Sequence, residues 1–166
     1  MKPVTTSYSI NKKLSITHYL TAFCVFFTLF CPDKAQNIIS AIGILSFGIL
    51  HGAKAYCIQD NDGQIGETES LSSGLDYPSV SPLHCFLKDT GRAEYTSATD
   101  EQALEAYKLV SKLENISPSL EPSHAFATAI SLAPKLSKDT ILCIDSCGHS
   151  LKDSDIIKEK LGFYTE

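Results

Sequence analysis

The sequence predicts an α/β fold with a parallel sheet, and three observations in its C-terminal half carry that prediction. Two segments, one after Thr99 and one around Pro122, repeat their apolar residues at helical spacing. A short, nearly continuous apolar run, Thr140–Ile144, is typical of a strand that is buried on both faces. A polar loop and a last helix follow it. Helix, helix, strand, loop and helix of these lengths are the succession found in layered α/β proteins.

Two short features precede the predicted helices. Asp60–Gly63 predicts a β-turn. It is not a calcium loop, because Leu71 stands where an EF-hand needs its glutamate. Glu94–Ala98 is rich in residues that favour strands and is a short strand candidate.

The first helix has a predicted capping box, in which Thr99 caps the N–H of Gln102 and Gln102 reaches back. Pro122 suits the first turn of the second helix, where a missing N–H is tolerated. The apolar stripes predicted to be buried on the two helices are Ala103, Ala106, Tyr107, Val110 and Leu113, and then Ala125, Phe126, Ala129, Ile130 and Ala133.

After Thr140–Ile144 the polar loop Asp145–Asp153 leads to a helix over Asp155–Leu161, with Ser154 as its cap and Gly162 at its C-terminal end. Ligands of parallel α/β sheets bind at the carboxyl ends of the strands. The stretch 145–150 is therefore a candidate ligand loop, and Cys147 and Gly148 lie in it.

Charge divides the chain into two predicted parts. Residues 1–47 carry four lysines and one aspartate, a net +3, so residues 48–166 carry −8 of the total of −5. An acidic body argues against a nucleic-acid partner, because phosphate binding needs clustered lysines and arginines. We predict a basic, apolar head over 1–47 and an α/β body over 48–166.

The head contains two apolar runs of about 13 residues, Tyr19–Cys31 and Ile38–Leu50, each shorter than the roughly 20 residues that span a bilayer. Three interpretations stay open. The runs form a membrane-associated helical hairpin that turns at Cys31–Asp33, the first run is a signal peptide, or the head is sequence joined to the body by truncation or frameshift.

The six cysteines show no metal-type spacing, and we interpret them as reduced thiols of a cytoplasmic protein. Glu121 and His124 are three residues apart at a helix start, so both side chains could face one site. Their plainer interpretations are a favourable charge at the helix N-terminus for Glu121 and a packing role for His124. Asp76 lies in a loop rich in glycine, proline and serine, where an Asx turn is its plainer interpretation.

Residues 48–166 resemble the C-terminal part of the tryptophan synthase beta chain. The matching segments, in order, are Gly48–Gly52, Gln59–Ile65, Ser73–Val80, Gly91–Tyr95, Thr99–Ala106 and Leu120–Ala125. The resemblance implies part of a three-layer, fold-type-II pyridoxal-phosphate domain. It also implies a lyase of tryptophan biosynthesis, which condenses indole with L-serine and has an alpha chain as its partner.

The resemblance also implies site residues. Glu121 matches the glutamate beside the cofactor ring, and Cys147, followed by Gly148, matches the serine that binds the ring nitrogen. Asp76 matches the aspartate that closes the active site. Tyr77 and Ser79 match positions whose backbone carbonyls bind a monovalent cation.

The sequence departs from the family in two ways. The family loop Ser-Gly-Arg-Gly-Asp-Lys-Asp is replaced by Cys147–Asp153, and no His-Lys-x-Asn segment supplies a Schiff-base lysine. A phosphate cradle is missing too. We therefore expect a fragment that is inactive alone and has no covalently bound cofactor. One alternative is complementation, in which the fragment docks onto a separately encoded N-terminal beta-chain piece as its partner. The other alternative is a non-catalytic, membrane-associated or interaction protein that reuses the α/β body, with residues 19–50 as its membrane contact.

Overall fold

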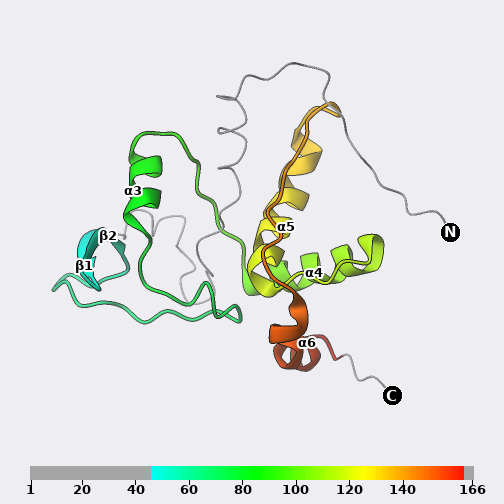
Figure 1. The fold of residues 1–166 in the computed structure, drawn as a ribbon, viewed down its shortest axis with the longest axis horizontal. Helices are drawn as coiled ribbons and strands as arrows, with labels where there is room; N and C mark the ends of the chain where they lie inside the picture. Colours follow the sequence, from blue (N-terminus) through cyan, green and yellow to red (C-terminus); the bar gives the residue numbers. More distant parts are fainter. Residues whose placement is uncertain (1–45, 163–166) are drawn as a thin grey trace.

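The computed structural model describes residues 46–162. Figure 1 shows two groups of elements joined by extended segments. One group contains a β-hairpin and the helix α3 (Pro82–Asp89), and the other contains α4 (Asp100–Glu114), α5 (Leu120–Leu132) and α6 (Ser154–Leu161). Short 3₁₀ turns, η1 (Ala133–Lys135) and η2 (Ser150–Asp153), follow α5 and precede α6.

The hairpin pairs β1 (Ser46–Leu50) with β2 (Ala53–Cys57) in antiparallel register, from Ser46 opposite Cys57 to Leu50 opposite Ala53. His51 and Gly52 form its two-residue turn, and both have positive φ, 49° and 79°. Positive φ at both positions matches the twist of the flanking strands, which is why such tight hairpins favour a glycine.

Helix α3 begins where Ser81 accepts a hydrogen bond from the N–H of His84, and Pro82 occupies its first turn. The helix contacts β2, and the buried Cys85 accepts the N–H of Tyr56 at 3.2 Å. This sulfur contact ties α3 to the hairpin.

The predicted capping box of α4 is confirmed: Thr99 and Gln102 exchange hydrogen bonds at 3.1 and 2.9 Å. Asn115 ends the helix with φ of 56°. The chain then leads into α5, which packs against α4. A core of Leu104, Leu120 and Ile157 joins these helices to α6, and Leu71 packs against it.

The buried stripes are confirmed only in part. Ala103, Ala106 and Val110 on α4 and Ala125 and Ala129 on α5 are buried. The predictions for Leu113, Ile130 and Ala133 are wrong, because Leu113 and Ile130 are 65% and 41% exposed and Ala133 is exposed too.

Neither predicted strand forms. Glu94–Ala98 and Thr140–Ile144 are irregular, and the sheet of the described residues is the antiparallel hairpin alone. A strand exists through hydrogen bonds to a neighbouring strand, and residues 46–162 provide no neighbour for these two segments. Helices with a small sheet agree with an α/β protein, but no parallel, three-layer sheet is present in this part of the chain.

The end of the last helix is confirmed, with Gly162 at φ 65° in the predicted C-terminal position. Its start differs by one residue. Asp153 is the cap and Ser154 is the first helical residue, because η2 runs directly into α6. The β-turn at Asp60–Gly63 is confirmed by the 3.1 Å bond from the Gly63 N–H to the Asp60 carbonyl.

The predicted apolar run Tyr19–Cys31 lies outside the described residues. Of the second run, only the last residues are described, and they belong to β1 instead of a helix. Within residues 46–162, no helix has the length and hydropathy needed to cross a membrane. The cysteines described are free thiols, and Cys143, predicted to be buried in a strand, is exposed.

Candidate functional site

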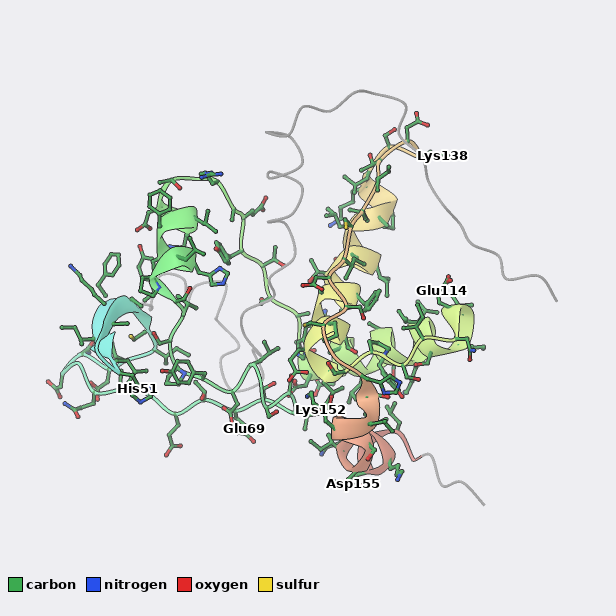
Figure 2. All side chains as sticks on the ribbon, in the orientation of Figure 1. His51, Glu69, Glu114, Lys138, Lys152 and Asp155 are labelled. Carbon is green, nitrogen blue, oxygen red and sulfur yellow. The ribbon has the colours of Figure 1, made fainter. Side chains whose placement is uncertain are left out.

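Glu121, at the start of α5, is the meeting point of three chain segments. Its carboxylate accepts the N–H of Gly74 at 3.0 Å and lies 2.9 Å from the ammonium group of Lys152. Gly74 comes from the segment before α3, and Lys152 from η2. In Figure 2, Lys152 lies near the base of α5, where α4 and α6 approach it. We call Gly74, Glu121, Lys152 and Asp153 the Glu121 corner.

Burial is the largest single influence on the pKa of Glu121 and raises it, but several effects that act in the opposite direction together outweigh burial. The Lys152 ammonium group and backbone N–H groups that include that of Gly74 stabilise the carboxylate and lower the pKa to about 2. The side chain is 19% exposed. Glu121 is therefore a largely buried anion at neutral pH, and it presents only hydrogen-bond acceptors.

Lys152 also lies 2.7 Å from the carboxylate of Asp153. Burial lowers the pKa of Lys152, and the two carboxylates more than reverse this effect and raise it. Asp153 is almost fully buried, and its second oxygen accepts the N–H of Leu120 at 2.9 Å. An orphan N–H of α5 is thus satisfied from η2, and this hydrogen bond and Lys152 together join the two elements.

The candidate ligand loop lies against the same helix start. The hydroxyl of Ser119 donates to the carbonyl of Cys147 at 3.0 Å, and the Ser150 N–H donates to the Ser117 carbonyl at 3.1 Å. Gly148 has φ of 87°, and a Cβ there would lie 2.9 Å from the Ser119 hydroxyl. A glycine permits this close approach.

The predicted site residues therefore form two groups. Glu121, Cys147 and Gly148 lie around the start of α5, and Cys147 is exposed there. Asp76, Tyr77 and Ser79 follow Gly74 along the chain toward the hairpin.

The hairpin holds two residues of this second group, Tyr77 and Ser79. The hydroxyl of Tyr77 is 2.6 Å from Nδ1 of His51, and the hydroxyl of Ser79 donates to the carbonyl of Tyr56 at 3.1 Å. Asp76, the first residue of the second group along the chain, is exposed. The segment that carries Gly74 and Asp76 thus links the hairpin to the Glu121 corner.

His124 does not share the environment of Glu121. Its side chain is fully buried, with Nε2 3.2 Å from the carboxylate of Asp100 on α4. Its burial agrees with the interpretation as a packing histidine, and a carboxyl group lies beside it.

Sequence reasoning missed Gly74, Asp100 and Lys152 as site residues. Lys152 and Asp153 follow the candidate loop directly, and this was the available signal. Gly74 and Asp100 gave none, because their contacts with Glu121 and His124 depend on segments 24 or more residues away.

A separate groove of about 540 Å³ is lined jointly by α4, by α5 and by the stretch before α4. Residues that line it include Ala98, Glu101, Gln102, Leu109 and Ile130. It contains none of the predicted site residues.

Known proteins identify the family of this chain. It is 53% identical over 131 residues to the tryptophan synthase beta chain of Cereibacter sphaeroides, which covers 79% of this chain. The corresponding proteins of Roseobacter denitrificans and Rhodopseudomonas palustris are 51% and 50% identical, over 70% and 69% of it. No family model matches the sequence.

The chain matches only part of the length of each relative. The chain covers 32% of the Cereibacter sphaeroides protein and 28% of the other two. This chain therefore carries a segment of the tryptophan synthase beta chain family that corresponds to about a third of its relatives' length.

Proposed function

We propose that this chain contributes one edge of the cofactor site of a tryptophan synthase beta-type enzyme. The enzyme would condense indole with L-serine in a pyridoxal-phosphate-dependent reaction of tryptophan biosynthesis. The observation that carries the proposal is the Glu121 corner, where an ionised, largely buried carboxylate lies beside the Cys147–Gly148 loop. Sequence identity of 53% and 51% to beta chains, over 79% and 70% of this chain, supports the same assignment.

The side chains present fit the ring edge of pyridoxal phosphate. The exposed Cys147 thiol is able to donate to or accept from a ring nitrogen. Gly148, which approaches Ser119 without a side chain, keeps the loop close to the helix that carries Glu121. These residues would hold the ring edge, and the family's phosphate cradle has no counterpart in this sequence.

Pyridoxal phosphate, when bound, supplies an electron sink for reaction at the amino-acid substrate. This chain would contribute residues that position the cofactor ring and that place charge beside it. Glu121, kept ionised by Lys152, would place a fixed negative charge at the ring edge. Asp76, exposed in the segment after Gly74, would close the site over substrate. The backbone carbonyls of Tyr77 and Ser79 would bind a monovalent cation beside the hairpin.

We further propose that residues 1–166 alone neither bind the cofactor covalently nor make tryptophan. Covalent binding needs a positioned lysine, and the sequence holds no His-Lys-x-Asn segment. A beta-chain piece with the lysine and phosphate cradle would be the first partner, and an alpha chain the second. This function implies a cytoplasmic location.

Complementation tests the proposal. The full chain is co-expressed with the part of the Cereibacter sphaeroides beta chain that it does not match, and tryptophan formation from indole and serine is measured. We expect activity only when both pieces are present. We also expect Glu121→Ala to lower it at least tenfold, whereas Glu105→Gln, an exposed change on α4, leaves it unchanged. Tryptophan formation, or a visible absorbance band from a lysine-linked cofactor, with the purified chain alone would overturn the proposal of inactivity. A stable complex of the two pieces without activity would overturn the proposed function.

A further inference from the structure

We propose that His124 is a positioning residue for Glu121, acting through Asp100 and the segment Ser70–Gly74. The inference deepens the proposed function and rests on it only for the role of Glu121 at the cofactor ring. The physical link between His124 and Glu121 can be measured without cofactor.

The ring of His124 has a different contact at each nitrogen: Nδ1 makes a hydrogen bond, whereas Nε2 approaches a carboxylate without one. Nδ1 lies 2.7 Å from the carbonyl of Leu120, one turn earlier in α5, and Nε2 lies 3.2 Å from the Asp100 carboxylate. A carbonyl only accepts hydrogen bonds, so Nδ1 carries the proton in that contact. The ring is thereby oriented with its second nitrogen toward α4. Its side chain is 1% exposed, so water does not compete for these contacts.

Asp100 connects this ring to a third segment. One carboxylate oxygen accepts the Ser70 hydroxyl at 3.1 Å, and the other accepts the Leu71 N–H at 2.9 Å. Asp100 is also the first residue of α4, where a negative charge is favourable. The carboxylate therefore joins α4, α5 and the start of the segment that leads to Gly74.

The path from Leu71 to Gly74 is short and ordered by its own contacts. Ser72 is fully buried, and its carbonyl accepts the N–H of Leu75 at 2.9 Å. Gly74 then donates to Glu121 at 3.0 Å. Only two residues separate Leu71 from Gly74, so a displacement of Leu71 is expected to move Gly74 as well.

Little space separates Gly74 from Glu121. A Cβ on Gly74 would lie 2.7 Å from the carboxylate oxygen and 2.9 Å from Cγ. The N–H of Gly74 is one of the groups that lower the pKa of Glu121. The position of the 70–74 segment therefore affects both the orientation and the charge of Glu121.

The test compares three variants of the full chain. His124→Leu keeps a large buried side chain and removes both polar contacts. His124→Gln keeps a polar side chain whose amide N–H is able to donate to a carboxylate. Ala129→Gly is the matched control, because it destabilises the same helix at a buried position away from this network. Two signals are followed by NMR: hydrogen exchange of the Gly74 amide and the titration of the Glu121 carboxyl.

We expect His124→Leu to speed exchange at Gly74 at least tenfold and to move the Glu121 pKa from about 2 toward its ordinary value of 4.5. His124→Gln should restore much of both signals. Ala129→Gly should leave the Glu121 titration unchanged and should speed Gly74 exchange by no more than its overall loss of stability explains. If His124→Leu behaves as Ala129→Gly does, the proposal is wrong.

If His124→Leu does not fold, Ser70→Ala replaces it, since Ser70 is only half-buried and bonds to the same carboxylate. Unchanged Gly74 exchange and Glu121 titration in Ser70→Ala would then overturn the proposal, and altered signals would support it. None of these signals depends on the cofactor. A failed complementation with intact coupling would therefore reject the proposed function and leave the positioning link standing.

Discussion

The ammonium group of Lys152 lies 2.9 Å from the carboxylate of Glu121, across 31 positions of sequence. This contact joins the N-terminus of α5 to η2, and it places a positive charge beside the glutamate that the family resemblance puts at the cofactor ring. The ion pair is mostly buried on the glutamate side and 45% exposed on the lysine side. Salt and solvent therefore reach it from one direction.

Lys152→Met should raise the pKa of Glu121 and destabilise the fold by about 1–2 kcal/mol, since it removes the cation shared by two carboxylates while solvent screens part of the loss. Chemical denaturation and a carboxyl titration measure both effects. Lys158→Met is the control, because Lys158 is 60% exposed and its nearest acidic partner is 3.9 Å away. Equal effects of the two variants would contradict a special role for Lys152.

Gly74→Ala should destabilise the fold by about 1–3 kcal/mol, because the added methyl group overlaps the Glu121 side chain. The neighbouring Ser73→Ala, at an exposed position, should change the free energy of unfolding by less than about 0.5 kcal/mol. Denaturation midpoints of the two variants, measured side by side, check the difference. A neutral Gly74→Ala would mean that the Glu121 side chain moves away at little cost.

Acid should weaken the fold through Glu121. Its pKa is lowered from 4.5 to about 2 in the folded chain, so the unfolded state takes up its proton first as pH falls. The contribution is therefore fully present above about pH 4.5 and is lost between pH 4.5 and 2. Urea unfolding at pH 7, 4 and 3 measures it. Glu121→Gln should flatten this part of the profile, whereas the exposed Glu101→Gln should keep it; parallel profiles for the wild type and Glu121→Gln would contradict the assignment.

Thr99→Ala should cost about 1 kcal/mol, because it removes the hydroxyl that accepts the Gln102 N–H at the start of α4. Thermal denaturation reports the loss. Thr96→Ala, three residues before the cap and outside the helix, is the control and should be nearly neutral. A similar melting temperature for both variants would show that the capping box contributes nothing to stability.

The accuracy of the sequence predictions follows the range of the interactions involved. The capping box at Thr99, the turn at Asp60 and the end of α6 at Gly162 were predictable, since each depends on residues within a few positions of one another. The strands at Glu94–Ala98 and Thr140–Ile144 were not, because a strand needs a distant partner and the described residues provide none.

The candidate site shows the same division. The family resemblance of the sequence predicted Glu121, Cys147 and Gly148 as site residues. The ionisation of Glu121 and the contacts around His124 were decided by tertiary structure, which brings Gly74, Lys152 and Asp100 to them from distant segments. Local patterns encode caps and turns because their hydrogen bonds close within one turn of chain. Charge and burial depend on which segments pack together, so they were decided only by the folded arrangement.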